Sequence, residues 1–360
     1  MPTEAIAKTA LPSMAPHAAR RILRLAMGTA LCALFSQAMA WPLSFIAPVF
    51  TLLLLGLPMP APKLKAGIGL VLVLLAPMVM GIALLPFMTW IRPVAILLTI
   101  LILFHLFYHT AVGGKTVLGS LLTVSISVIL AVGSVNISAL AVLIIALGQN
   151  AVIGLAFVWI GHALLPDLPS KAVASTVPPA LAPPSPQQAR FIALRAMVIV
   201  LPAALFILVS PDSPSYMVVM IKLASMGQQA SAEQNRKLGL SLLESTLWGG
   251  LGAIIGWQMI AMWPSLIFFT LLIALACLLY GRGIFSGQGM HAKGQMWSYA
   301  LLTMIVLLVP AVSDSLGGSD ANQAFWSRLW LVAIIAVYGT LVAAAVDAFR
   351  PSGHSGIPAT

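Results

Sequence analysis

Long apolar runs with almost no charge inside them constrain this chain more than any other feature. Of its 360 residues, 61% are hydrophobic and only 7% are charged, whereas charged residues make up about 25% of a soluble domain. A soluble fold cannot bury so much apolar surface, and a bilayer accepts a spanning backbone only as helices or closed barrels. Since about 20 apolar residues form one transmembrane helix, the sequence predicts an all-α polytopic membrane protein.

The runs predict twelve transmembrane helices in two groups of six, although ten spans would keep the same parity. The stretch from Pro166 to Gln188 carries seven prolines, and such a segment is expected to be an extended linker. The predicted parts are a disordered tail at 1–19, a first six-helix repeat at 20–165, a cytoplasmic linker at 166–189, a second six-helix repeat at 190–350 and a tail at 351–360. Spans are predicted near 21–41, 44–60, 66–87, 92–112, 116–134, 138–164, 190–210, 214–231, 238–260, 263–281, 295–312 and 326–349.

The loop charges predict the orientation of the chain in the membrane. With both termini in the cytoplasm, the cytoplasmic segments carry fifteen Lys and Arg residues and the opposite side carries only Arg92 and Arg328. This agrees with the excess of basic residues in the cytoplasmic loops of membrane proteins. The net charge of +10 therefore reflects membrane orientation, and we expect no nucleic-acid partner. Cys32 and Cys277 lie far apart in apolar runs, which predicts neither a disulfide framework nor a metal site.

The two halves of the chain resemble each other. Arg24 and Phe45 are separated by the same 21 residues as Arg195 and Tyr216, and further pairs follow in the same order. Six spans per half would give both halves the same orientation. The sequence therefore predicts a duplication into parallel repeats, related by an axis along the membrane normal.

Three motifs connect the chain with a known group of proteins. At Arg24-Leu-Ala-Met-Gly28, Trp41-Pro42 and Ser245-Thr246-Leu-Trp-Gly249-Gly250, it resembles the fusaric acid resistance-like superfamily, which includes bacterial aromatic acid exporters and plant malate channels. Because the linker is too short for a cytosolic domain, the chain resembles a compact, membrane-only branch. The resemblance implies efflux of organic anions across the bacterial inner membrane, often with a periplasmic membrane-fusion (adaptor) protein as partner.

Lys222 and Glu244 lie inside apolar runs, where an ionisable side chain costs about 2.5–3.5 kcal/mol on insertion scales and marks a functional site by default. Helical rise places both within a few turns of the same cytoplasmic loop. We therefore expect them to pair, with Lys222 binding a substrate carboxylate and Glu244 coupling transport to protons. The alternative is a structural ion pair, or side chains that snorkel to the interface.

His105 and His109 lie one turn apart on a predicted helix, with Tyr108 between them. This spacing suits a proton relay or aromatic-acid binding, whereas a metal site would need a further ligand. Gln149 and Asn150 lie in the middle of another predicted span. Such amides either bond neighbouring helices together or line a polar path.

Glycines follow Glu244 at Gly249, Gly250 and Gly252. They predict close packing of helices, or else a broken helix beside the site.

These features lead us to expect a proton-driven secondary exporter of small, particularly aromatic, organic acids. The alternatives are a passive organic-anion channel and a non-transporting membrane subunit of an efflux complex. The chain has no phosphate-binding loop and no zinc or nucleophile constellation, so we expect no enzyme activity, catalytic residue, metal or cofactor. The expected partners are the lipid bilayer, a small organic anion, the adaptor protein and, as an option, further copies of the chain. Lys222→Ala and Glu244→Gln are each expected to abolish efflux.

Overall fold

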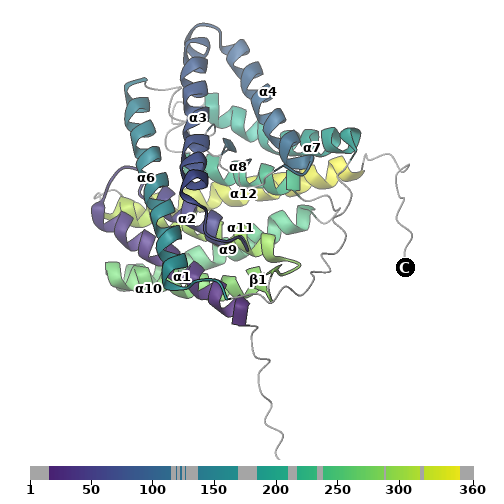
Figure 1. Cartoon of the computed structure of the whole chain (residues 1–360). Coiled ribbons are helices and arrows are strands. Elements are labelled where there is room, and N and C mark those ends of the chain that lie inside the picture. The colour runs from purple at the N-terminus through teal and green to yellow at the C-terminus, as the bar shows by residue number, and fades with distance from the viewer. Residues whose placement is uncertain are drawn as a thin grey trace, which may run out of the picture.

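The structure is a computed structural model, and it describes residues 16–114, 119, 122–123, 126, 137–168, 185–209, 217–232, 238–287, 289–316 and 320–348. Within these residues the chain is helical apart from two short strands, β1 (Phe285–Ser286) and β2 (Gly289–Met290), which pair antiparallel (Figure 1). The helices are α1 (Pro16–Met39), α2 (Ile46–Leu55), α3 (Leu64–Trp90), α4 (Arg92–Ala111), α6 (Ile137–Leu164), α7 (Pro186–Val209), α8 (Met217–Ala232), α9 (Leu238–Met262), α10 (Leu266–Ile284), α11 (Gly294–Leu316) and α12 (Ala321–Ala348).

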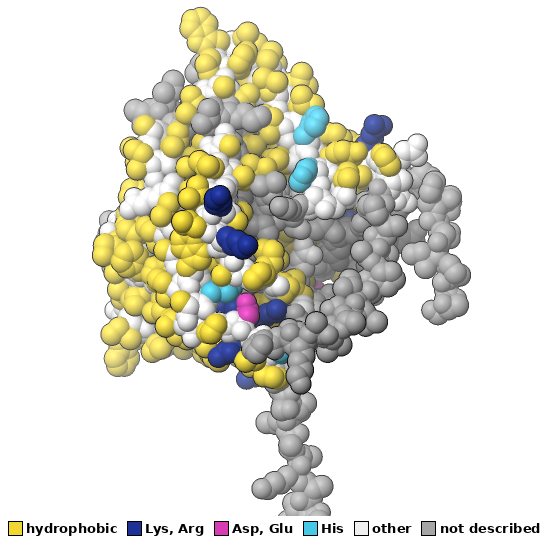
Figure 2. All heavy atoms as spheres, viewed as in Figure 1, with side chains coloured by type: hydrophobic (Ala, Val, Ile, Leu, Met, Phe, Trp, Pro, Cys, Tyr) yellow, Lys and Arg dark blue, Asp and Glu magenta, His cyan; other side chains and the backbone are white. Residues whose placement is uncertain are grey.

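Seven stretches in these helices are long and apolar enough to cross a membrane. Their exposed surfaces carry large apolar side chains, and Figure 2 shows hydrophobic residues covering most of the described face. Lipid is the solvent that accepts such a surface, so the chain is a multi-pass, all-α membrane protein. The twelve spans and the repeats stay predictions. The seven stretches are Pro16–Met39, Pro93–Ala111, Ala141–Leu164, Pro186–Phe206, Leu266–Ile284, Gly294–Ser315 and Ala321–Val346.

Most predicted spans agree with the helices within a few residues, but the span predicted at 44–60 is too long. Helix α2 ends at Leu55, and its ten residues rise about 15 Å, half of the hydrocarbon thickness. The sequence Gly56-Leu57-Pro58 explains the early end, because the residue before a proline avoids the helical conformation. The span predicted at 116–134 lies mostly outside the described residues.

Two predicted segment boundaries are wrong by a helical turn, and both involve a proline. Helix α1 begins at Pro16 and takes in the last residues of the tail predicted at 1–19. Helix α7 begins at Pro186, inside the linker predicted at 166–189. There Ser185 and Gln188 form a reciprocal cap, in which each backbone N–H donates to the other side chain at 3.1 and 3.3 Å. Proline suits the first helical position because its missing N–H would have no partner there.

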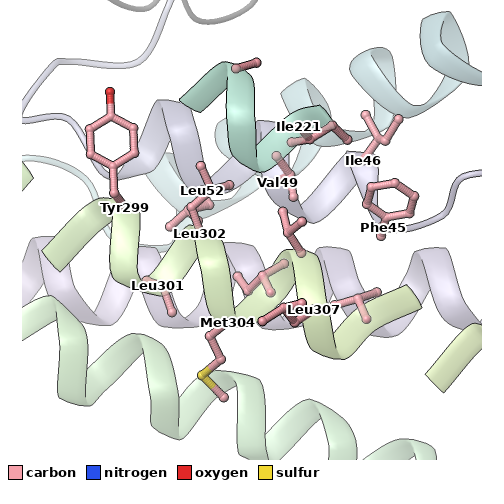
Figure 3. Packing of buried hydrophobic residues seen from close by; sticks show 14 of the residues in the cluster. Phe45, Ile46, Val49, Leu52, Ile221, Tyr299, Leu301, Leu302, Met304 and Leu307 are labelled. Carbon is pink, nitrogen blue, oxygen red and sulfur yellow. The ribbon is translucent and has the colours of Figure 1, made fainter. Parts of the chain in front are cut away.

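Helices α8 and α11 form the centre of the protein. Every described side chain from Val219 to Ala230 on α8 is buried, and α8 packs against α4, α7, α11 and α12. Figure 3 shows the apolar contact of α2 with its neighbours, where Leu52 lies beside Leu302 of α11 and Val49 lies near Ile221 of α8. A helix that is enclosed in this way can hold polar side chains away from both lipid and water.

The outer helices pack in two similar pairs, since α1 lies against α10 and α7 lies against α4. Helix α7 also contains Pro202, which cannot donate a hydrogen bond to the carbonyl of Val198, one turn earlier. The hydroxyl of Tyr338 on α12 donates to that carbonyl at 3.2 Å. A neighbouring helix thus satisfies the backbone group that the proline frees, as membrane helices require.

Candidate functional site

Lys222 is the buried cation around which the candidate site is built. It lies on α8 with 2% of its surface exposed, and its Nζ donates to Oγ1 of Thr303 on α11 at 2.7 Å. The hydroxyl of Thr303 in turn donates a hydrogen bond to the carbonyl of Tyr299 at 2.7 Å. The ammonium group therefore meets a neutral oxygen whose hydrogen already points elsewhere. An ammonium has three donors, so this oxygen satisfies only part of its capacity.

No carboxylate pairs with Lys222 among the described residues. The ion pairs found there join Arg24 to Asp167, Lys293 to Glu244 and Arg328 to Asp314. The predicted pairing of Lys222 with Glu244 is therefore wrong.

Glu244 pairs instead with Lys293, which precedes α11, at 3.0 Å. Its position on α9 explains the error, because depth along a helix does not fix the direction in which a side chain points. Helix α9 turns Ser241 toward α8 and Glu244 toward the start of α11. The side chains of Lys293 and Glu244 are 62% and 39% exposed, and exposed pairs contribute about 0–1 kcal/mol. Glu244 thus lies in a solvated surface pair and not in the core.

Helical rise places Lys222 and its acceptor Thr303 at a similar distance from the neighbouring ends of α8 and α11. Ten residues separate Lys222 from the end of α8 at Ala232, and nine residues separate Thr303 from the start of α11 at Gly294. At 1.5 Å per residue, both stretches rise about 15 Å, half of a hydrocarbon core of about 30 Å. A lysine side chain is too short to carry its charge over that distance to these helix ends.

Gly249 of α9 brings a third helix against the acceptor of Lys222. A methyl group added at Gly249 would lie 2.5 Å from the carbonyl oxygen of Ala300 and 2.6 Å from Cβ of Thr303. Glycine is therefore required for α9 to approach α11 at this level. Helix α9 runs without a break through Gly249, Gly250 and Gly252, so the prediction of close packing is confirmed and the broken helix is not found.

Polar side chains continue from Lys222 along α8. Gln228 accepts a hydrogen bond from Thr110 of α4 at 2.9 Å and donates one to Thr123 at 2.6 Å. Gln229 donates to Ser241 of α9 at 2.9 Å. Both amides are buried and bridge segments of the chain. Their position in an apolar helix was the available sequence signal, whereas nothing in the sequence identified Thr303.

Two arginines that the predicted repeat would pair, Arg24 and Arg195, are almost fully buried. Arg24 of α1 donates to Asp167 at 2.9 Å, just after α6. Arg195 of α7 donates to the carbonyl of Ala230 in the last turn of α8 at 3.2 Å. A cation at a helix C-terminus interacts favourably with the carbonyls that have no partner inside the helix. Both guanidinium groups thus hold the end of a helix or the segment that follows it.

The predicted histidine pair lies away from the buried site. His105 and His109 on α4 are exposed, and Nδ1 of His105 lies 2.8 Å from the carbonyl of Leu101. Tyr108 is half-buried and stacks on Phe104, with ring centroids 6.2 Å apart. The structure does not bring these residues together with Lys222. No group of three metal-ligating side chains occurs in the described part of the chain.

The two adjacent amides of α6 have different surroundings. Gln149 is exposed. Asn150 is fully buried, and its oxygen accepts from Nε1 of Trp41 at 3.2 Å while its nitrogen donates to the carbonyl of Pro42 at 3.3 Å. Asn150 thus fastens the connection between α1 and α2 to α6. The described partners of Asn150 lie in that connection and in α6 itself, so the predicted bond to another helix is not found among them.

Comparison with known proteins gives one family match. Residues 21–160 match a family described as "Protein of unknown function (DUF2955)". No curated protein and no solved structure matches the chain. The family description assigns no activity. The residues around Lys222 are therefore the available evidence on function.

Proposed function

We propose that this protein moves small organic anions across a membrane by way of a binding site at Lys222. The observation that carries the proposal is a deeply buried ammonium group whose described partner is a neutral hydroxyl. Insertion scales put the cost of a charge inside a membrane at about 2.5–3.5 kcal/mol. A structural ion pair would offset that cost with a fixed carboxylate, and no described carboxylate contacts Lys222. A transported anion would do so during transit.

Carboxylates suit this site because Lys222 and Thr303 lie side by side. The ammonium supplies charge and further N–H donors, and the hydroxyl of Thr303 becomes a donor when it turns away from the carbonyl of Tyr299. Charge-assisted hydrogen bonds of this kind are roughly twice as strong as neutral ones. The chemistry supports transport of an anion rather than an enzymatic reaction.

The proposed architecture is twelve spans in two parallel six-helix repeats, with both termini in the cytoplasm. The matching packing of α1 on α10 and of α7 on α4 supports it, because a twofold axis would exchange these pairs. The family match supports it as well, since residues 21–160 nearly coincide with the first predicted repeat at 20–165. The bacterial inner membrane, outward transport and an adaptor partner rest on the resemblance to the fusaric acid resistance-like superfamily.

Passive conduction is the second candidate. The sequence suggested proton coupling through Glu244, but this carboxylate pairs with exposed Lys293 and not with Lys222. Losing the proposed coupling group favours a channel over a proton-driven exporter. In proteoliposomes, a channel would pass anions down their gradient without a response to a pH step, whereas a coupled exporter would respond.

The experiment that tests the proposal is uptake of radiolabelled carboxylates into proteoliposomes, with phthalate as the first probe. Phthalate carries two charges at neutral pH, so it leaks slowly through protein-free liposomes. We expect Lys222→Met to abolish flux and Lys222→Arg to retain part of it. Lys293→Gln, which removes an exposed lysine at 62% side-chain exposure, is the matched control and should transport normally. Equal flux through the wild type and a well-folded Lys222→Met variant would show that Lys222 is not the site.

A further inference from the structure

We infer that a polar seam between α8 and α9 is the route by which anions reach Lys222 from the ends of these helices at Ala232 and Leu238. We call it the α8–α9 seam. The inference rests on the proposed function, because it supplies the access path to the same site. The seam consists of Lys222, Ser225 and Gln229 on α8 and of Ser241, Ser245 and Gly249 on α9.

Contacts at both ends of the α8–α9 seam align the two helices. At the outer end, Gln229 donates to Ser241. At the inner end, Lys222 donates to Thr303, against which Gly249 packs. The seven residues from 222 to 229 rise about 10 Å, and the eight from 241 to 249 rise about 12 Å. The two rises agree, so Lys222 and Gly249, which both approach Thr303 of α11, lie at the same level above the bond between Gln229 and Ser241.

Ser225 and Ser245 lie between these two ends, each on the same face of its helix as the end residues. Positions three, four and seven residues apart share a helix face. Ser225 is 6% exposed and Ser245 is fully buried. The seam therefore presents a polar group at each turn between the end of α8 and Lys222.

The hydroxyls inside the α8–α9 seam do not bond the helices together. Ser225 donates to the carbonyl of Lys222, and Ser245 donates to the carbonyl of Leu242, each within its own helix. Helix α8 also packs far more extensively on α7 than on α9. Buried serines that only bond their own backbone add nothing to helix association that alanine would not supply. Next to an approaching anion, the same hydroxyls can rotate and donate to it.

Two buried cations mark the ends of this route. Arg195 binds the carbonyl of Ala230, one residue beyond Gln229, and Lys222 lies eight residues further into the membrane. Both are 2% exposed. A path lined by one sign of charge with low-dielectric walls raises the local concentration of the opposite ion. The positive charge at each end and the hydroxyls between them suit a small anion.

Cysteine labelling tests the route without knowledge of the natural substrate. Ser225→Cys and Ser245→Cys are introduced singly after Cys32 and Cys277, both buried, are replaced by alanine. Inverted membrane vesicles are then treated with methanethiosulfonates that carry either a sulfonate or a trimethylammonium group. We expect the anionic reagent to react at least about tenfold faster than the cationic one, relative to their rates with a free thiol. Phthalate should slow the reaction.

Matched variants distinguish labelling along the proposed route from labelling of any cysteine that the reagents can reach. Leu247→Cys lies two residues from Ser245 on the exposed face of α9, with 54% exposure, and should react with neither reagent because lipid disfavours the thiolate. Lys222→Met should remove the preference for the anionic reagent. Gln229→Ala, which breaks the bond to Ser241, should speed labelling at Ser245→Cys.

Failure of the route and failure of the proposed function give different results. If well-folded Ser225→Cys and Ser245→Cys proteins resist both reagents, the route is wrong whatever the flux assay gives. The same holds if their labelling shows no dependence on the charge of the reagent. If both thiols prefer the anionic reagent but Lys222→Met transports phthalate normally, the route stands and the role of Lys222 in transport is refuted.

Discussion

Replacing Gly249 by alanine is the sharpest structural test of the site. In a helix this change normally stabilises a protein by about 0.5–1 kcal/mol, because alanine loses less conformational entropy than glycine on folding. At Gly249 the added methyl group meets the carbonyl oxygen of Ala300 at 2.5 Å and Cβ of Thr303 at 2.6 Å. Both atoms belong to the framework of α11, so neither can rotate away as the tip of a flexible side chain could.

The expected magnitude follows from the movement required. Ordinary contacts of a methyl group begin near 3.4 Å, so α9 and α11 must separate by nearly an ångström at the level of Thr303. Overpacking of this kind costs about 1–3 kcal/mol, which exceeds the helix-propensity gain. Because Thr303 holds the ammonium of Lys222 at 2.7 Å, the separation should also weaken anion binding. We therefore expect lower stability together with a raised KM for transport.

The adjacent glycine provides the control. A methyl group at Gly250 would meet Cδ1 of Leu329 at 3.5 Å, an ordinary contact, so Gly250→Ala should be neutral or stabilising by about 0.5–1 kcal/mol. Reversible unfolding in mixed micelles measures stability, and proteoliposome uptake measures KM. If Gly249→Ala is as stable as Gly250→Ala and keeps the wild-type KM, the close approach of α9 to α11 does not position the site.

Two further variants test contacts outside the site. Tyr338→Phe removes the hydroxyl that donates to the carbonyl of Val198, the group that Pro202 leaves without a helical partner. It should lower the free energy of unfolding by about 0.5–1 kcal/mol, in the range of hydrogen bonds between membrane helices. An unchanged free energy of unfolding would mean that another donor replaces the hydroxyl. Glu244→Gln breaks the exposed pair with Lys293, and should change stability by at most about 1 kcal/mol and leave anion flux intact. Loss of anion flux in the Glu244→Gln variant would mean that Glu244 takes part in transport.

The sequence predicted the helices well because their cause is local. Apolar runs of membrane-spanning length form helices in lipid whatever they later contact, and most boundaries agree within a few residues. The errors occur where a few residues decide the boundary. Prolines end α2 early after Leu55 and begin α7 at Pro186. The cap formed by Ser185 and Gln188 was visible in the sequence as Ser-Pro-Gln-Gln.

The partner of Lys222 could not be predicted in the same way. Helical rise gives the position of Lys222 and Glu244 along their helices, since that position is proportional to residue number. The choice of neighbour depends on which faces the helices turn toward each other, and packing of the whole protein sets that rotation. Thr303 lies 81 residues away in sequence and resembles any other threonine in an apolar run. An isolated sequence therefore identifies the buried charge but not the group that it contacts.

The first half of the chain offers an internal comparison for Lys222. In the predicted repeat, the 171-residue offset between Arg24 and Arg195 would pair Lys222 with Thr51 of α2, whose hydroxyl lies within hydrogen-bond distance of the carbonyls of Ala47 and Gly154. A buried hydroxyl satisfied by backbone carbonyls needs nothing more. Lys222 donates to one described side chain, Thr303, and an anion 4 Å from its ammonium group would gain about 4 kcal/mol at an effective dielectric constant of 20. A fixed carboxylate would take up that attraction permanently. A neutral threonine leaves it available to a ligand that binds and dissociates, as the proposed transport function requires.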